Sequence, residues 1–179
     1  MRVLMFGWEF PPHIAGGLGT ACYGMTRGLA ENGVEVLFVM PSASGDEDQS
    51  SVRIINASDV AVDTMSETVD EFLGKVRFVH VGTNMVPYVS PEDFSSVVEE
   101  ERARQIKDFR ITYGQKYQFS GKYGTNLMEE VARYGMVGGT IALQHCDEFD
   151  VIHAHDWLTY LAGIAAKQLT GKPLVVHVH

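Results

Sequence analysis

The sequence predicts an α/β fold in which helices flank an open parallel sheet. At the N-terminal end, apolar runs at residues 3–6 and 34–40 enclose a stretch of helical periodicity, and a strand–helix–strand unit of this length implies a right-handed crossover between parallel strands. The same pattern returns at the other end as strand 150–154, helix 157–170 and strand 173–179. With 179 residues and 45% hydrophobic content, the chain can build one domain core.

Glycine and asparagine mark the ends of the first elements. Gly7 ends the first strand, and Asn32 with Gly33 ends the first helix, which the apolar spacing predicts over residues 18–32. The polar stretch 42–51 after the second strand is a predicted loop.

The middle of the chain gives weaker patterns. Residues 52–56 and 76–81 resemble strands, and residues 64–74 between them form either a short helix or a loop. Ser90 is the expected N-cap of a charged helix. Residues 113–124 are rich in aromatic residues and glycine, which predicts a lobe or flap.

Helical periodicity resumes over residues 125–144, with Thr125 or Asn126 as the cap. Gly138 and Gly139 inside this helix are expected to allow close packing on a neighbouring element. We therefore predict one sheet with insertions and flanking helices.

Composition argues against several classes of partner. The chain has 14 basic and 23 acidic side chains and a formal charge of −9, which argues against a nucleic-acid surface. No run reaches about 18 apolar residues, so we expect no membrane span, and we expect no signal peptide. Cys22 and Cys146 have no ligand-like spacing, and as reduced thiols they indicate a cytoplasmic protein.

Three places that could carry chemistry follow or end predicted strands. They are the loop 8–19, the segment 153–157 (HAHDW), and the pair His177 and His179. Ligands of open parallel sheets bind at the carboxyl ends of the strands, so we expect the three places to meet across one crevice.

The glycine pair that opens the first helix has two interpretations. Backbone N–H groups near Gly16, Gly17 and Leu18 could bind a phosphate at the positive end of the helix, or the glycines could form only a tight turn. A dinucleotide fingerprint fits poorly, because Cys22 stands at the last glycine position, and no GK[ST] of a Walker loop is present.

The segment 153–157 places several functional side chains at a strand-to-helix junction. His153 and His155 lie on the same side of an extended strand, and Asp156 turns into the helix. We expect at least one of these residues to be functional. The structural alternatives are a buried His153 that bonds to the backbone and an Asp156 that caps the helix.

The two HxH pairs also raise a metal-dependent hydrolase as an alternative. His153, His155, His177 and His179 resemble, together with Asp156, the ligand sets of such enzymes. However, no lysine or further carboxylate lies nearby in sequence to complete a two-metal cage, and the glycine loop would have no role. We therefore predict no metal and no other cofactor.

The loop WEFPP…AGGLG, the segment DVIHAHDW and the final VHVH together resemble the N-terminal half of the glycogen and bacterial starch synthases. These are retaining glucosyltransferases of the two-domain GT-B type, so the resemblance implies a Rossmann-like N-terminal half. It implies a nucleotide-sugar donor, ADP-glucose or UDP-glucose, and an α-1,4-glucan acceptor, as in glycogen biosynthesis. It also implies that the chemistry needs no metal.

The resemblance assigns roles to individual residues. Gly16, Gly17 and Leu18 match the loop that lies against the donor pyrophosphate. His155 matches the histidine that reaches the transferred glucose near the reacting carbon, which makes it the expected catalytic residue. The residues expected to line the sugar-binding crevice are Glu9, Asp156, His177 and His179.

Two features qualify this resemblance. Ile14 stands where many members carry a lysine two residues before the glycine pair, which supports a non-catalytic glucan-binding module as another alternative. The family's nucleotide site and its strongest phosphate-binding cations belong to a C-terminal domain. Because the chain ends on the strand pattern PLVVHVH, we expect residues 1–179 to be the acceptor-side domain of a longer protein, able to fold but inactive alone.

Overall fold

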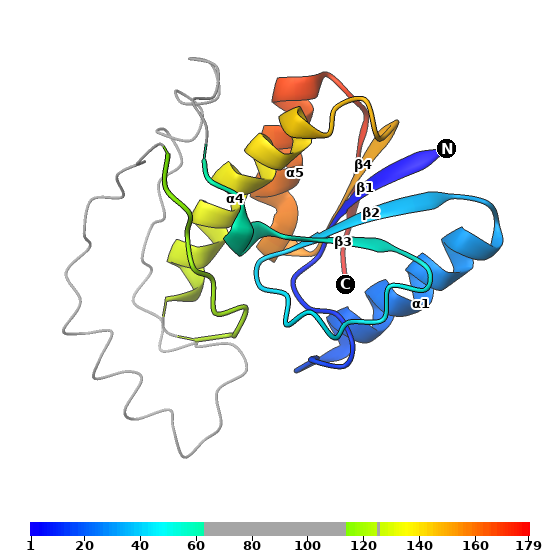
Figure 1. Cartoon of the computed structure of the whole chain (residues 1–179), viewed down its shortest axis with the longest axis horizontal. Coiled ribbons are helices and arrows are strands. Elements are labelled where there is room, and N and C mark those ends of the chain that lie inside the picture. The colour runs from blue at the N-terminus through cyan, green and yellow to red at the C-terminus, as the bar shows by residue number, and fades with distance from the viewer. Residues whose placement is uncertain (63–113, 125) are drawn as a thin grey trace.

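A five-stranded parallel sheet forms the centre of the computed structural model, which describes residues 1–62, 114–124 and 126–179 (Figure 1). Every strand pairs with its neighbours in parallel, in the order β3-β2-β1-β4-β5. The strands are β1 (Arg2–Phe6), β2 (Glu35–Met40), β3 (Arg53–Asn56), β4 (Val151–His155) and β5 (Leu174–His177). The predicted α/β fold with an open parallel sheet is confirmed.

The strand order changes direction between β1 and β4. From β1 the chain continues outward to β2 and β3, whereas β4 leads to β5 on the other side. At the carboxyl end of β1, Phe6 pairs with Val39 on one side and with Ala154 on the other. In open α/β sheets such a reversal creates a ligand-binding crevice at the carboxyl ends of the strands. The loops after β1 and β4 therefore flank the position where a ligand is expected.

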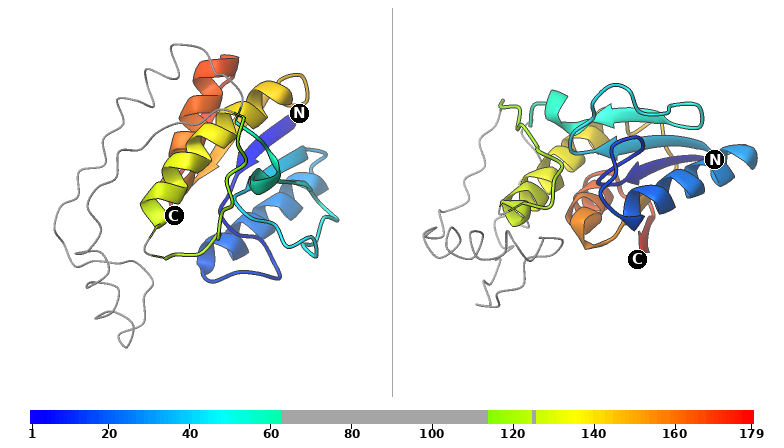
Figure 2. Two further views of the ribbon diagram at one scale, coloured as in Figure 1. Left: turned by 60° about the vertical axis from the view of Figure 1, so that its left-hand side comes forward. Right: turned by 90° about the horizontal axis from the view of Figure 1, so that it is seen from below.

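Helices cover both faces of the sheet (Figures 1 and 2). Helix α1 (Gly17–Glu31) connects β1 to β2 on one face, while α4 (Leu127–Gln144) and α5 (Trp157–Thr170) lie together on the opposite face. The two strand–helix–strand units run in opposite directions along the sheet, so right-handed crossovers place their helices on opposite faces. A short 3-10 helix, η1 (Ala57–Asp59), follows β3.

Helix α4 packs closely on α5 and on the sheet. A Cβ atom at Gly138 would lie 2.7 Å from the Cβ of Ala162 in α5, so only glycine allows this approach. The buried Tyr134 hydroxyl lies 3.0 Å from the Gly7 carbonyl oxygen and 2.8 Å from that of Val39. The close packing predicted at Gly138 is confirmed.

The segment 114–124 is packed on the core. Phe119 is buried, and its N–H donates to the Ser58 hydroxyl at 3.1 Å. The Glu130 carboxylate, buried in the first turn of α4, accepts the N–H groups of Ser120 and Gly121. This segment, predicted as part of a lobe or flap, forms no helix or named strand, and the buried Phe119 and the Glu130 carboxylate attach its middle to the domain.

The remaining sequence predictions have mixed outcomes. The predicted end of α1 is confirmed, since Asn32 is its C-cap and Gly33 has a positive φ of 71°. The strand predicted at residues 76–81, the stretch 64–74 and the helix predicted from Ser90 lie outside the described residues. Within the described parts of the chain, no helix is both long and apolar enough to cross a membrane.

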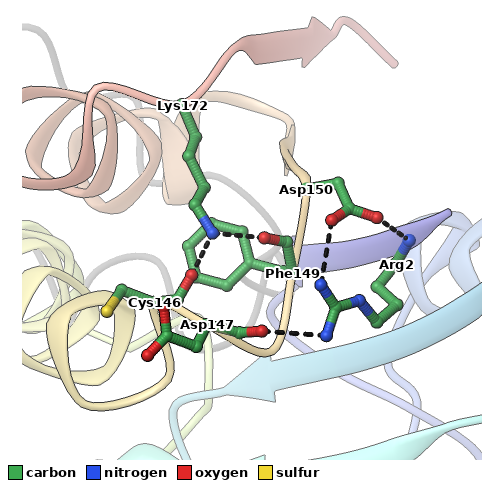
Figure 3. Close-up of polar contacts among 6 residues, drawn as sticks. All are labelled: Arg2, Cys146, Asp147, Phe149, Asp150 and Lys172. Atoms are coloured by element: carbon green, nitrogen blue, oxygen red, sulfur yellow. Dashed lines mark hydrogen bonds and ion pairs between the residues drawn. The ribbon is translucent and has the colours of Figure 1, made fainter.

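Polar contacts join the amino ends of β1 and β4 to the turn between α4 and β4 (Figure 3). The Arg2 guanidinium donates to Asp150 Oδ1 at 3.0 Å and to the Asp147 carbonyl at 2.8 Å. The Lys172 ammonium donates to the carbonyls of Cys146 and Phe149. These contacts fasten the turn between α4 and β4 at the edge of the sheet opposite to the expected crevice.

Candidate functional site

The loop between β1 and α1 is anchored by buried aromatic side chains. Trp8 and Phe10 have exposed fractions of 1% and 0%. The Phe10 ring centroid lies 4.8 Å from that of Phe38 in β2 and 5.6 Å from that of Tyr23 in α1. The loop ends at Gly16, the extended N-cap residue of α1. Aromatic burial therefore fixes the path of the chain toward the glycine pair.

The Glu9 carboxylate binds the backbone at the start of α1. Its Oε2 accepts the Ala15 N–H at 2.8 Å, and its Oε1 accepts the N–H groups of Gly16 and Gly19, each at 3.2 Å. Glu9 is only 4% exposed. A buried negative charge at a helix N-terminus is stabilised by the helix dipole as well as by these bonds. Glu9 thus holds the glycine loop in this structure, and its expected place in the wall of the crevice stays a prediction.

This contact changes what the glycine pair offers to a ligand. The Gly16 N–H, expected to face a diphosphate, already donates to Glu9. The N–H groups of Gly17 and Leu18 make no hydrogen bond to any other residue that the structure describes. Gly17 is exposed, and a Cβ there would meet no atom within 4 Å, whereas the Leu18 side chain is buried in the core. The surface above Gly17 is therefore open to an anion.

Gly19 is a structural requirement that the sequence patterns did not single out. A Cβ at this position would lie 2.4 Å from Ile14 Cγ2 and 2.9 Å from Glu9 Cγ. Ile14 itself is 41% exposed, beside the loop. The Ile14 side chain therefore packs against Gly19 in the first turn of α1. Because this side chain is apolar, position 14 provides no positive charge beside the glycine loop.

The histidines of β4 and β5 share the sheet face on which α1 lies. A Cβ at Gly163 of α5 would contact the Ala154 side chain, so Ala154 faces α5. Successive side chains in a strand alternate between faces, and His153 and His155 therefore point to the opposite face. His155 pairs directly with His177 in the parallel register, which places His177 on that same face.

Four imidazole rings form a cluster at this position, which we call the histidine cluster: His153, His155, His177 and His179. The His155 centroid lies 4.1 Å from that of His153, 5.1 Å from that of His177 and 5.3 Å from that of His179. His155 Nδ1 lies 3.0 Å from His179 Nε2, so these two rings share a hydrogen bond. The structure thus brings together the two HxH pairs that the sequence placed on separate strands.

The histidine cluster is electrically neutral at its centre. Burial, followed by the neighbouring histidines, lowers the pKa of His153 to about 4 and that of His155 to about 3. Burial, followed by His177, also lowers the pKa of His179. Neutral imidazoles can donate and accept hydrogen bonds or bind a metal, but they provide no positive charge for a phosphate.

Two buried nitrogen atoms of the cluster have no partner among the described residues. The buried Nε2 atoms of His153 and His155 make no hydrogen bond there. His155 has no exposed surface, and a buried polar atom without a partner costs about 1–3 kcal/mol. The alternative in which His153 bonds to the backbone through this atom is therefore not what the structure shows.

Asp156 occupies the N-cap position of α5 but does not use its side chain there. Its backbone has φ 61° and ψ 167°, and the carboxylate makes no capping hydrogen bond. The predicted capping role was therefore wrong in this detail. The Asp156 N–H donates to the His177 carbonyl at 2.8 Å, and the buried Thr159 hydroxyl donates to the His155 carbonyl at 2.8 Å. These bonds fix the turn that follows His155, and the sequence patterns did not identify Thr159.

The fold and the site define an α/β domain that gathers a glycine loop and a histidine cluster at the carboxyl ends of adjacent parallel strands. The chain belongs to the family described as starch synthase catalytic domain, which it matches over residues 2–179. The resemblance seen in the sequence motifs is thus confirmed. The Rossmann-like sheet with its flanking helices is consistent with the N-terminal half of a GT-B glycosyltransferase.

Curated relatives match along the whole chain at low identity. An uncharacterized glycosyltransferase of Methanocaldococcus jannaschii is 24% identical over 180 residues, which cover 100% of this chain and 31% of that protein. A glycogen synthase of Mycobacterium tuberculosis is 25% identical over 179 residues, which cover 100% of this chain and 33% of that protein. The chain therefore spans about a third of the length of these relatives.

Proposed function

We propose that residues 1–179 are the N-terminal, acceptor-side domain of a retaining glycosyltransferase that transfers glucose from a nucleoside-diphosphate-glucose to an α-1,4-glucan. The family match over residues 2–179 is the observation that carries this proposal. The similarity to a glycogen synthase along the whole chain supports it further. The free thiols of Cys22 and Cys146 favour a reducing, cytoplasmic setting.

His155 is the proposed catalytic residue. It lies at the carboxyl end of β4, where the strand order reverses and ligands of this fold class bind. Its Nδ1 is held by His179 and its carbonyl by Thr159, so the ring has a defined orientation. Its Nε2 has no partner among the described residues, and because the ring has no exposed surface here, a sugar hydroxyl would reach this atom only after the neighbouring side chains move. A neutral, oriented imidazole can position the glucose without attracting the diphosphate away from its own site.

The donor diphosphate is proposed to lie at the N-terminus of α1. The N–H groups of Gly17 and Leu18 and the positive end of the helix dipole favour an anion there. The Gly16 N–H contributes indirectly, because it fixes the loop through Glu9. Glu9 adds negative charge at this helix end and Ile14 adds none of the opposite sign. Departure of the diphosphate therefore requires cations from elsewhere, and we assign them to the protein's own C-terminal domain.

The proposal is tested by supplying donor and acceptor to the full-length protein. We expect release of the nucleoside diphosphate to depend on glycogen and to accompany elongation of its chains. Parallel reactions with ADP-glucose and UDP-glucose determine the donor base. Residues 1–179 alone should release no nucleoside diphosphate, because the cations that stabilise the leaving group are not provided by this domain. Release without any acceptor elongation by the full-length protein would contradict the proposed transfer.

A metal-dependent hydrolase is not favoured by the described residues. The group of side chains there that could hold a metal consists of His153, His155 and His177, with no carboxylate among them. Two-metal hydrolytic centres need bridging or charge-balancing ligands, and family membership points to transfer instead.

A further inference from the structure

Three histidines of the histidine cluster offer nitrogen ligands close to one another. One ring nitrogen each from His153, His155 and His177 can be chosen so that all three atoms lie within 4.8 Å of one another. Strand geometry causes this arrangement, since His153 and His155 are two residues apart on β4 and His177 stands beside His155 on β5. Three imidazoles from two hydrogen-bonded strands thus offer nitrogen atoms close together, with the rings of His153 and His177 stacked at an interplanar angle of 8°.

The hydrogen bond between His155 and His179 orients a ligand atom. If Nδ1 of His155 donates its proton to His179 Nε2, then Nε2 of His155 carries a free lone pair. That Nε2 is buried and has no partner among the described residues, as is also true of Nε2 of His153. Histidines that bind metals generally donate their second ring N–H to such a neighbour, which fixes the tautomer and the ring. Through its hydrogen bond to Nδ1, His179 therefore fixes the orientation of the His155 ring.

We propose that His153, His155 and His177 bind one divalent transition-metal ion of the zinc class, with His179 as the positioning residue. Imidazole nitrogen suits Zn²⁺, Co²⁺ and Ni²⁺, whereas Mg²⁺ and Ca²⁺ prefer oxygen ligands. Zinc–nitrogen distances of about 2.0–2.1 Å place tetrahedral ligand atoms about 3.4 Å apart. Binding therefore requires the three rings, which are stacked or tilted by 8–33°, to rotate so that their nitrogen atoms approach more closely than the present limit of 4.8 Å. Three protein ligands leave the fourth tetrahedral position open.

This site goes beyond the proposed transfer reaction and does not serve it. A metal on Nε2 of His155 occupies the same lone pair that the proposed sugar contact uses. The ion is therefore a ligand that competes with the proposed function and not a cofactor of it. Only the histidine geometry supports the metal site, so a metal-binding measurement tests it whether or not the protein transfers glucose.

The test is a titration of the full-length protein with Co²⁺ and with Zn²⁺ after removal of metals by a chelator. The visible absorption spectrum of Co²⁺ shows how the ion is bound, because the bands typical of tetrahedral Co²⁺ arise only when the ion is bound in that geometry. We expect one equivalent to bind, and calorimetry to show that Zn²⁺ displaces it. The variants H153A and H177Q should each lose the tetrahedral bands. The variant H179Q should bind about 10–100-fold more weakly, as expected for a residue that orients a ligand.

Matched controls come from histidines elsewhere in the chain. His13 lies 2.8 Å from Asp46, and His145 lies 2.7 Å from Glu148, so each already pairs with a carboxylate that could help to hold an adventitious ion. H13A and H145A should bind metal as the unmodified protein does. H177Q alters a strand at the edge of the described sheet, so its circular dichroism spectrum should remain native even if H153A disturbs the core. Absence of stoichiometric binding by the unmodified protein, or unchanged binding by folded H177Q, would overturn the proposal.

Discussion

Replacing Glu9 by glutamine is expected to loosen the entrance to α1. The carboxylate accepts three backbone N–H groups, from Ala15, Gly16 and Gly19. In E9Q the amide oxygen can retain the bonds of one carboxylate oxygen, but the amide nitrogen then faces an N–H group that it cannot accept. The negative charge at the helix N-terminus is also lost, which removes about 0.3–1 kcal/mol of dipole stabilisation.

The expected loss follows from these contacts. Hydrogen bonds to charged groups contribute about 1.5–3 kcal/mol each, and the three bonds here are not additive because they share one carboxylate. We therefore expect E9Q to lower the free energy of unfolding by about 1–3 kcal/mol. Urea denaturation followed by tryptophan fluorescence measures this loss, since Trp8 is adjacent and buried. Hydrogen exchange locates it, because the Gly19 amide should lose protection.

Glu130 provides the matched control for Glu9. It is 3% exposed and its carboxylate likewise accepts backbone N–H groups, those of Ser120 and Gly121, but it lies in α4. E130Q should destabilise the chain to a similar degree while leaving the Gly19 amide protected. If E9Q and the unmodified chain protected Gly19 equally, the carboxylate would not hold the glycine loop, and the reasoning would fail.

Two further predictions concern the loop and the histidine cluster. G19A should lower the free energy of unfolding by about 1–3 kcal/mol, because its Cβ would lie 2.4 Å from Ile14 Cγ2. G17A should change this free energy little, because a Cβ at position 17 meets no atom within 4 Å. Equal losses for the two variants in urea denaturation would refute this account. The pKa is lowered to about 4 for His153 and to about 3 for His155, whereas a histidine in the unfolded chain has a pKa of about 6.5. These two histidines therefore predict a free energy of unfolding that is constant above about pH 6.5 and falls below it. The reason is that the unfolded chain binds protons in this range and the folded chain does not. The slope is at most about 1.4 kcal/mol per pH unit for each histidine, and urea denaturation from pH 7.5 to 5 should find it reduced in H153F.

Local sequence patterns predicted the fold well because its elements depend on short-range signals. Apolar spacing predicted the buried strand at residues 3–6, and the helix stop signal Asn32-Gly33 predicted the end of α1. The small size of glycine predicted the close packing at Gly138. For residues 114–124, the aromatic and glycine content predicted neither the burial of Phe119 nor the Glu130 carboxylate that holds the segment. Tertiary contacts decide such segments.

The candidate site was predictable in its residues but not in its contacts. Parallel strands with polar carboxyl ends brought both HxH pairs to one edge, as expected, but only the register of β4 with β5 places His155 beside His177. Glu9 does not stand at the spacing of a capping box from the glycine pair. The hydrogen bonds from its carboxylate to the backbone at the start of α1 could therefore not be predicted from the sequence. The positive φ of Asp156 likewise depends on the turn between strand and helix, which composition does not encode.

The most direct test of the central proposal is the rate of nucleoside-diphosphate release by the full-length protein when His155 is replaced. With glycogen and the preferred donor, H155A and H155N should each lower kcat by at least about 10²-fold, because an oriented imidazole at the reacting sugar is lost. H145A removes a histidine that pairs with Glu148 at the end of α4, and it should retain the unmodified rate. Equal rates for folded H155N and H145A would contradict the assignment of His155 as the catalytic residue.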